Sequence, residues 1–439
     1  MAKGLVIAVI GGGSSYTPEL IEGLLAHPRT FPVAQIRLLD VEAGRTQQSI
    51  IASLARRMVD ASALPIRIIE TLDRDEALTD ADFVITQFRV GRMPARLLDE
   101  TIPARNGMLG QETVGIGGLF KALRTVPVVF DIIEDMKRLC PEAWLINFTN
   151  PAGIVSEAVF RYGDFSRFVG VCNVPVHVTH HLAEKASLNV NAITPIFAGL
   201  NHLSYVLHVY HGKNDVFEAV RASLGDMNMS MANIEPLVYT KAFIEHLEAI
   251  PGPYQRYYCF HEEMLEASLE AYRASNTRAA VVADIEKTLF ERYKDPQLTE
   301  KPEELARRGG AHYSTAACGL MRALHNDARV HQTVIAPNEG QLEDLPDGAA
   351  IEVTARITKD GPVPVRIGRL PLAVRGLVQQ MKAFEQMLAD AIYERDLQKA
   401  LSAWHVHPLS FSIRRGEQVF KELREAHRAY LDPYYGGTT

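Results

Sequence analysis

The segment "LVIAVIGGGSSYTPEL", residues 5–20, places three consecutive glycines between an apolar run and a helix-like stretch. The apolar run is rich in β-branched residues and ends in glycine, as is typical of a buried parallel strand. Thr17 suits the N-cap of the following helix, and Pro18 suits its first position. A strand, a glycine turn and a helix in this order form the phosphate-binding unit of a dinucleotide fold, because the glycine backbone can approach a pyrophosphate.

The glycine turn therefore predicts a dinucleotide site, formed by Gly11, Gly12, Gly13, Ser14 and Ser15. The strict pattern G-x-G-x-x-G is not met, because Tyr16 stands where the third glycine normally allows close packing of helix on strand. Asp40 ends the next predicted strand, at a separation suited to a carboxylate that binds the adenosine ribose. A carboxylate there repels a 2′-phosphate, so we expect NAD rather than NADP. The alternative is a plain glycine turn beside a surface aspartate.

Strand and helix patterns alternate up to about residue 175. Strand-like runs cover residues 36–40, 66–71, 82–90 and 143–148. Helical periodicity covers residues 46–61 and 126–139, and a further helix begins at Pro151. Alternation of this kind predicts an α/β fold with a doubly wound, Rossmann-like parallel sheet.

Beyond residue 176 the pattern changes. Long helical stretches, at 278–293 and 375–404, accompany strand-like pieces at 204–212 and 350–358. We expect two interlocked domains, an NAD-binding Rossmann-like domain over residues 1–175 and a C-terminal α/β domain for catalysis and oligomerisation over residues 176–439. The active site is then expected in the cleft between them.

Composition argues against nucleic acid or membrane as the main partner. Lysine and arginine number 46 against 53 aspartates and glutamates, a net charge of −7, and no basic block is present. No apolar stretch approaches the ~20 residues of a membrane span, and the first apolar run is too short for a signal peptide. The cysteines are few and widely spaced, as in reduced cytosolic proteins. We therefore expect a soluble cytoplasmic protein.

Polar clusters follow several predicted strand ends, where doubly wound sheets build their sites. They are "QFRVGRMPAR" (87–96), "GQETVGIGG" (110–118), "INFTNPAG" (146–153), "GVCNVP" (170–175), "GLNHLSY" (199–205), "PGPYQRYY" (251–258) and "RRGGAHYS" (307–314). Each has a purely structural explanation in isolation. Arg89 or Arg96 suits a solvated charge, Glu112 a helix cap, and Asn150 an N-cap. His202 suits a core histidine and Cys172 a small buried hydrophobe.

Together the clusters resemble the NAD-dependent family-four glycoside hydrolases, and within them the 6-phospho-β-glucosidases. "GGGSSYTPEL", "GQET", "NFTNPAG", "GVCNVP" and "GLNHL" carry the resemblance, which continues into "LEDLPDGAAIEV" (342–353) and so covers most of the chain. It implies hydrolysis of a phosphorylated β-linked disaccharide such as cellobiose 6-phosphate. It also implies a homodimer or homotetramer.

The resemblance makes Cys172 and His202 ligands of a catalytic divalent metal, usually manganese (Mn2+) in this family. A thiolate and an imidazole leave coordination positions for sugar oxygens and water. These ligand types alone do not distinguish manganese from zinc, iron, cobalt or nickel. The histidines of "HVTHH" (177–181) are a rival metal site, which we expect to be helix surface or core instead.

The resemblance further implies a redox-assisted elimination, the known exception to catalysis by two carboxylates. NAD⁺ takes hydride from C3, which acidifies the proton on C2, and Tyr254 removes that proton. The leaving group then departs from C1, water adds, and hydride returns to C3. Free tyrosine has a pKa near ~10, so a metal cation must assist it as a base. Glu112 is implied to tune Tyr254.

The same carry-over makes three residues substrate-binding positions: Arg96, Asn150 and Arg278. Arginine suits the 6-phosphate because its planar fork grips phosphate with two hydrogen bonds. The sequence does not decide between these arginines and further candidates at Arg89, Arg256 and Arg308.

Two residues bear on specificity. Asn173 follows the metal cysteine, where family members acting on α-linked substrates tend to have an aspartic acid. Because asparagine cannot donate that proton, we expect β-linked substrates. Arg92 stands where many relatives have a second glycine, and its guanidinium is expected either to crowd the substrate pocket or to add a phosphate contact.

Two other function classes compete with this interpretation. "INFTNPAG" resembles the asparagine–proline turn of malate and lactate dehydrogenases, which implies an ordinary NAD-dependent hydroxy-acid dehydrogenase. Net conversion of NAD would distinguish that enzyme. The second competing class is a non-catalytic NAD-sensing module. Such a module would need neither a pair of metal ligands nor the polar clusters.

Overall fold

The computed structural model describes residues 4–229, 231, 234–309 and 312–436. Its largest feature is a nine-stranded sheet in the order β15-β14-β13-β6-β5-β4-β1-β2-β3. Six strands, paired in parallel, come from the first part of the chain: β1 (Leu5–Ile10), β2 (Val33–Leu39), β3 (Arg67–Thr71), β4 (Phe83–Thr86), β5 (Trp144–Asn147) and β6 (Phe168–Gly170). Their order, β3-β2-β1-β4-β5-β6, is that of a dinucleotide-binding sheet. The predicted fold class is therefore confirmed.

Both faces of this sheet are covered by helices, so its central strands are apolar throughout. Ile7 and Val9 of β1 are buried in one cluster with residues of α1 (Thr17–Leu25), α2 (Arg45–Ser62) and α13 (Tyr313–Asn326). Ala8 and Ile10 belong to the cluster on the opposite face, with residues of α3 (Arg74–Leu78), α5 (Gly115–Leu139) and α6 (Ala152–Tyr162). Successive side chains along a strand point to opposite faces of the sheet, which explains why both sets are buried.

The C-terminal part of the chain completes the same sheet. β13 (His331–Pro337), β14 (Ala350–Thr358) and β15 (Gly361–Pro364) pair antiparallel and continue the sheet beyond β6, where Ile335 faces Gly170. The main sheet thus takes strands from both sides of the expected boundary at residue 175. That boundary itself stays a prediction.

A second, smaller sheet contains β12 (Ile250–Pro251), β8 (Leu203–His211), β7 (Ile193–Leu200) and β9 (Asn214–Asp215). It packs against the main sheet through β7 and β14, where Thr354 accepts a hydrogen bond from Phe197 N and donates one to Pro195 O. A separate hairpin joins β10 (Met227–Asn228) to β11 (Val238–Tyr239). The β7–β8 turn is the part of this region that matters for the site.

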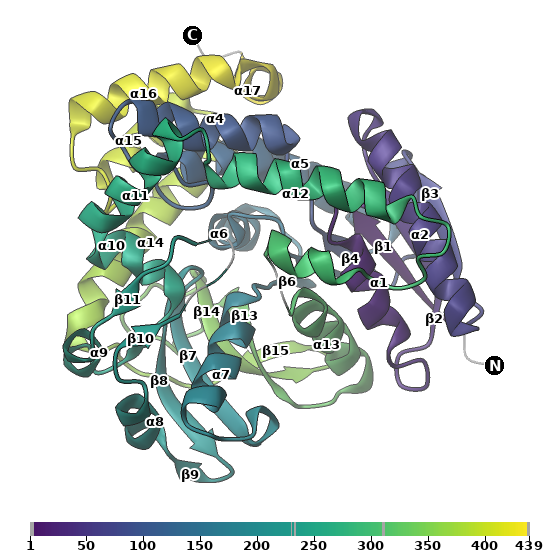
Figure 1. Ribbon diagram of the computed structural model, residues 1–439, viewed down its shortest axis with the longest axis horizontal. Helices are drawn as coiled ribbons and strands as arrows, with labels where there is room; N and C mark the ends of the chain where they lie inside the picture. Colours follow the sequence, from purple (N-terminus) through teal and green to yellow (C-terminus); the bar gives the residue numbers. More distant parts are fainter. Residues whose placement is uncertain (1–3, 230, 232–233, 310–311, 437–439) are drawn as a thin grey trace.

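The remaining helices surround these sheets (Figure 1). They are α4 (Arg92–Arg105), α7 (Val174–Lys185), α8 (Phe217–Ser223), α9 (Lys241–His246), α10 (Arg256–Cys259), α11 (His261–Arg273), α12 (Arg278–Tyr293), α14 (Leu372–Tyr393), α15 (Leu397–Val406), α16 (Ile413–Ala426) and α17 (Arg428–Tyr435). Short 3₁₀ turns lie at η1 (Glu42–Gly44), η2 (Val190–Ala192), η3 (Pro253–Gln255) and η4 (Glu303–Arg308). Helix α12, from the C-terminal part of the chain, packs against both α4 and α2 of the N-terminal part.

Three local expectations need correction. Tyr16, not Thr17, is the N-cap of α1, and the Thr17 hydroxyl instead donates to Gly12 O across the glycine turn. Strand β4 ends at Thr86, earlier than expected; Gln87 N still donates to Ile10 O of β1, while the Gln87 side-chain amide donates to Thr17 Oγ1. Helix α5 begins at Gly115, well before the expected start at residue 126.

Within the described residues, no helix combines the length and the apolar character that crossing a bilayer requires. All four cysteines are unpaired, and only Cys259 is exposed.

Candidate active site

The glycine turn lies at the carboxyl end of β1, between β2 and β4, where a doubly wound sheet binds a dinucleotide. Gly11 has φ +88°, and a Cβ there would lie 3.0 Å from the backbone of Gln87. A Cβ on Gly12 would lie 2.7 Å from that of Leu38. The turn thus has no room for side chains, which keeps its backbone open to a ligand. These features fit the pyrophosphate of NAD.

Asp40 closes the turn from the end of β2. Its Oδ2 accepts a 2.8 Å hydrogen bond from Gly13 N, and its Oδ1 accepts one from Val41 N. The carboxylate is therefore fixed beside the glycines, where a ribose would lie. Its contact with ribose stays a prediction.

The two serines of the turn differ in their surroundings. Ser14 Oγ accepts a hydrogen bond from Tyr16 N, which tightens the turn. Ser15 is buried, and its hydroxyl donates to Glu286 Oε1 on α12 at 2.9 Å. Ser15 therefore connects the glycine turn to the charged region described below.

Cys172 and His202 converge from different elements. Cys172 follows β6, and His202 lies in the turn between β7 and β8 with a left-handed backbone (φ +62°). Cys172 Sγ is 3.7 Å from His202 Nε2. Burial raises the pKa of the Cys172 thiol to about 12 and lowers the pKa of His202 to about 3. The imidazole is thus neutral, the form that binds a metal.

This pair fits one divalent ion. Bonds of about 2.3 Å to sulfur and about 2.0–2.1 Å to nitrogen place two tetrahedral donors about 3.6 Å apart. No group of three or more histidine, cysteine, aspartate or glutamate side chains among the described residues is arranged to hold a metal. A pair of protein ligands leaves the other positions to water and substrate, as a catalytic site requires. A metal would also favour the thiolate of Cys172.

Tyr254 packs against His202, one of the two predicted metal ligands. Its ring stacks on that of His202, with centroids 3.8 Å apart and 3° between the planes. Thr113, which follows Glu112 in the chain, acts on the Tyr254 hydroxyl and lowers its pKa against the effect of burial. Burial raises the pKa of Tyr254, so its phenol needs a nearby cation to act as a base at neutral pH.

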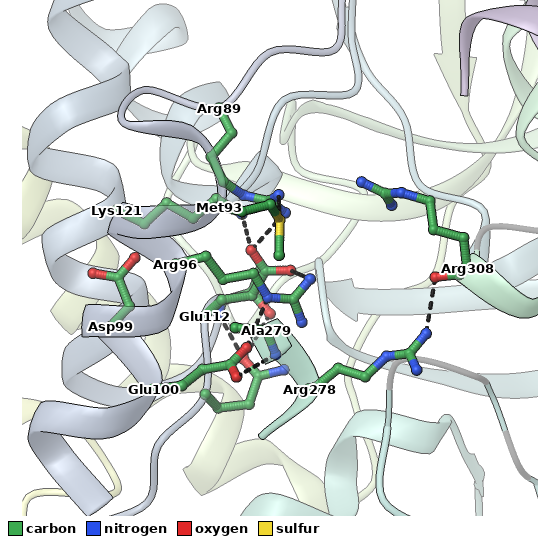
Figure 2. Close-up of polar contacts among 12 residues, drawn as sticks. Arg89, Met93, Arg96, Asp99, Glu100, Glu112, Lys121, Arg278, Ala279 and Arg308 are labelled. Carbon is green, nitrogen blue, oxygen red and sulfur yellow. Dashed lines mark hydrogen bonds and ion pairs between the residues drawn. The ribbon is translucent and has the colours of Figure 1, made fainter. Parts of the chain in front are cut away.

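Glu112 is the anion at the centre of a buried charge cluster (Figure 2). Its Oε2 accepts from Arg89 and Lys121, each at 2.7 Å, and its Oε1 lies 3.1 Å from Arg96. These three cations hold the pKa of Glu112 well below its usual range despite burial. Burial beside two arginines lowers the pKa of Lys121 to about 8. Because Arg89 and Arg96 both contact Glu112, the alternative that they are simply solvated charges is wrong.

Further charges surround this cluster. Arg96 also pairs with Glu100 at 2.7 Å, and Arg308 pairs with Glu286. Figure 2 shows the Arg308 guanidinium pointing toward the group around Glu112, with Arg278 hydrogen-bonded to Arg308 O beneath it. Five cations (Arg89, Arg96, Lys121, Arg278, Arg308) face three carboxylates (Glu100, Glu112, Glu286), which leaves two positive charges in excess. Within the described part of the chain, the buried Arg89 Nε also has no hydrogen-bond partner. This region suits an anion.

The remaining predicted residues are placed as follows. Asn150 Oδ1 accepts from Ala152 N at the start of α6, and Asn173 is the N-cap residue of α7 beside Cys172. The Arg256 guanidinium donates to the carbonyls of Met229 and Glu235, so it has a structural role.

Arg92 has a left-handed backbone (φ +54°), the conformation that favours glycine. Its guanidinium hydrogen-bonds to Ala43 O in η1, next to the Asp40 end of the nucleotide site. This extra arginine is therefore directed to the nucleotide side of the site, and the expected crowding of the substrate pocket is not seen.

Among the described residues, the rival histidines belong to no group of three or more metal-ligating side chains. His180 stacks on His312, with ring centroids 4.3 Å apart, and His181 is half-buried on α7. Gly310 and Ala311 of "RRGGAHYS" lie outside the described residues.

Several residues of this region were missed from the sequence, among them Glu100, Lys121, Asn201, Glu286 and Glu352. The Arg96–Glu100 spacing of four was a usable helix pattern. Lys121 and Arg124 are the two charged residues of the otherwise largely apolar stretch at residues 114–130, which also marks Lys121. Glu352 approaches Asn201 from a distant strand, and no local pattern predicts that contact.

Comparison with known proteins shows what the chain is similar to. Residues 6–188 match the family 4 glycosyl hydrolases, and residues 197–410 match the family 4 glycosyl hydrolase C-terminal domain. A probable 6-phospho-β-glucosidase of Bacillus subtilis is 47% identical over 437 residues, which cover 99% of both chains. A 6-phospho-β-glucosidase of Escherichia coli is 43% identical over 436 residues, covering 98% of this chain and 97% of that protein.

Solved structures extend the comparison. The 6-phospho-β-glucosidase of Thermotoga maritima, solved with manganese, NAD⁺ and glucose-6-phosphate, has a TM-score of 0.88 at 33% identity, covering 97% of this chain and 99% of that chain. Cryptosporidium parvum malate dehydrogenase has a TM-score of 0.51 at 14% identity, covering 89% of this chain and all of that chain. The second likeness concerns the fold alone.

Proposed function

The chain belongs to family 4 of the glycosyl hydrolases, and from this premise we propose that it hydrolyses 6-phospho-β-glucosides, such as cellobiose 6-phosphate. The observation that carries the proposal is the convergence of Cys172, His202 and Tyr254 beside a buried region with excess positive charge. This reaction needs an NAD site, two protein ligands for one metal ion, a base and an anion site, all at one edge of a sheet.

The proposed cofactors are NAD and a divalent metal, with Mn2+ favoured because the related Thermotoga maritima enzyme was solved with both. The glycine turn and Asp40 would hold NAD, and Cys172 and His202 would hold the metal. When bound, NAD⁺ would accept hydride from C3 of the sugar and later return it, while the metal would stabilise negative charge on the sugar oxygens.

Tyr254 is proposed to remove the proton from C2. Its ring is fixed against His202, so the base is held in place before substrate binds. Burial, and then the neighbouring Cys172 and Glu112, raise the pKa of Tyr254, and Arg96 opposes this shift in favour of the phenolate. Glu112 partly neutralises the positive charge of Arg89, Arg96 and Lys121. We propose that it tunes the base in this way, by limiting the effect of these cations on the pKa of Tyr254.

The 6-phosphate is proposed to bind in the region of excess positive charge. A phosphate monoester carries about two negative charges at neutral pH, which matches that excess. Arg96 and Arg278 are the substrate-binding arginines expected from the family, and Arg89 and Arg308 adjoin them. Asn150 is proposed to bind the sugar from the start of α6.

Asn173 supports a preference for β-linked substrates, because its amide cannot serve as the acid that α-linked substrates are expected to need. We also propose a cytoplasmic homodimer or homotetramer, and sedimentation would test its size.

Hydrolysis in heavy water tests the proposal. A chromogenic β-glucoside 6-phosphate should be cleaved only with NAD⁺, Mn2+ and a reducing agent, and the product should carry deuterium at C2. Full activity without cofactor and metal, or a product without the label, would point to direct displacement by two carboxylates. Net formation of NADH from a hydroxy acid would instead support the dehydrogenase alternative.

A further inference from the structure

The turn that carries His202 has a backbone that needs support. Only Asn201 and His202 separate β7 from β8, and Leu200 and Leu203 are paired on either side. His202 has φ +62°, a conformation that residues other than glycine adopt infrequently. Because the imidazole direction depends on this backbone, the contacts that fix the turn also fix the metal ligand.

Glu352 supplies such contacts from outside the turn. It lies on β14, is 1% exposed, and accepts hydrogen bonds from residues on both sides of His202. Asn201 Nδ2 donates to its Oε1 at 2.8 Å, and Ser204 Oγ donates to its Oε2 at 2.5 Å. The carboxylate therefore holds both ends of the short segment that contains the ligand.

The same carboxylate reaches the other ligand through Asn201. The Asn201 side chain, which donates to Glu352, also acts on the Cys172 thiol and lowers its pKa against the effect of burial. Asn201 thus connects Glu352 to the cysteine, and the turn connects it to the histidine. The turn also supports the base, because Gln255, next to Tyr254, donates from Nε2 to Ser204 O at 2.6 Å.

We propose that Glu352 is the positioning residue of the metal centre, which acts by orienting Asn201 and the β7–β8 turn so that Cys172 and His202 meet one ion. This inference rests on the proposed function, because it assumes that the pair binds a divalent metal. Partners that orient metal ligands typically contribute about 10–100-fold to metal affinity.

Metal binding to the full-length protein with NAD⁺ tests the inference without reference to activity. Free Mn2+ can be followed by electron paramagnetic resonance, and Co2+ reports thiolate coordination by its near-ultraviolet charge-transfer band. Glu352→Met removes both acceptors at similar volume, and we expect it to weaken Mn2+ binding at least tenfold and to diminish the cobalt–thiolate band. Affinity for NAD⁺ should be unchanged.

Two variants make the test specific. Glu352→Gln keeps an oxygen for Asn201 and an amide that the Ser204 hydroxyl can accept from, so it should restore Mn2+ affinity to within about threefold of wild type. Thr354→Val removes hydrogen bonds from the same strand, β14, to β7 at a distance from the turn, and should leave Mn2+ affinity unchanged. Should Glu352→Met fail to fold, Asn201→Ala breaks the same connection and carries the same expectation.

Three outcomes are decisive. Wild-type affinity in Glu352→Met, or in Asn201→Ala, would overturn the inference. A loss in Glu352→Gln equal to that in Glu352→Met would also overturn it, because charge rather than positioning would then be responsible. Absence of Mn2+ binding by the wild-type protein would refute the proposed function instead.

Discussion

The rings of His202 and Tyr254 lie parallel, 3.8 Å apart at their centroids, although they come from the β7–β8 turn and from η3. The proposed metal ligand and the proposed base are thereby held at a fixed separation. A cation bound by His202 would lie close enough to lower the pKa of the neighbouring phenol. In the proposed mechanism, this aromatic contact would couple metal binding to proton transfer.

Removal of the Tyr254 hydroxyl should stop the reaction and leave the metal site intact. Tyr254→Phe retains the ring that stacks on His202 but loses the base, so we expect kcat to fall by about 10²–10⁴-fold. Mn2+ affinity should be unchanged, and exchange of the C2 proton with heavy water should be lost. Tyr258→Phe, whose hydroxyl contacts Met381 Sδ at 3.9 Å, is the matched control and should keep wild-type kcat. Continued exchange in Tyr254→Phe would assign the base elsewhere.

Loss of the Cys172 thiolate should remove the response to metal. Chelation of the wild-type protein should abolish hydrolysis and added Mn2+ should restore it, whereas Cys172→Ala should stay inactive at Mn2+ concentrations that saturate the wild type. Cys318→Ala removes another buried thiol, which lies near Leu20 O, and should respond as the wild type does. Equal Mn2+ titrations for Cys172→Ala and wild type would contradict the assignment.

Neutralising Glu112 should destabilise the fold in a pH-dependent way. Glu112→Gln leaves three buried cations without their shared partner, and we expect a loss of about 3 kcal/mol in the free energy of unfolding at pH 7. The folded state lowers the pKa of Glu112, so its stabilisation is complete above the unfolded pKa of about 4.3 and disappears as the pH falls through the folded value.

Urea denaturation at several pH values measures this difference. The gap between wild type and Glu112→Gln should shrink below about pH 4. Glu42→Gln removes an exposed partner of Arg45 and should leave the unfolding free energy within experimental error of wild type at pH 7. A gap that stays constant from pH 7 to pH 3 would show that Glu112 contributes through packing rather than charge.

The loop that carries Glu112 depends on a glycine. A Cβ on Gly110 would lie 2.0 Å from the backbone oxygen of Glu100, so Gly110→Ala must displace the loop from α4. We expect kcat/KM to fall at least tenfold and the free energy of unfolding to fall by about 1–3 kcal/mol. Gly376→Ala, in α14 with no atom near its Cβ, should raise the free energy of unfolding by about 0.5–1 kcal/mol. Steady-state kinetics and thermal unfolding check both, and unchanged kinetics in Gly110→Ala would contradict the expectation.

Much of the fold was predictable because its patterns are local. The expected helix at residues 278–293 and the expected strand at residues 350–358 coincide with α12 and β14. The early start of α5 was missed, because Gly117, Gly118 and Pro127 interrupt the usual helix pattern. The addition of β13 to β6 was also not predicted, since an antiparallel pairing between distant strands leaves no short-range pattern.

The residues of the candidate site were likewise predicted only in part. Motif resemblance identified Cys172, His202 and Tyr254, and the structure brings their side chains together. The roles of these residues remain predictions. Lys121 and Glu352 were missed because their function depends on which buried groups they meet, and that is decided by the packing of α5 and β14.

The return of β13, β14 and β15 to the main sheet has a consequence for biosynthesis. While the ribosome is still synthesising the later residues, the emerging first half has β6 as an open edge with unpaired backbone groups, and such edges invite pairing with other chains. Newly made molecules are therefore most vulnerable to misassembly before residue 337 emerges, and a shortened gene product ending near residue 190 should aggregate rather than bind nucleotide.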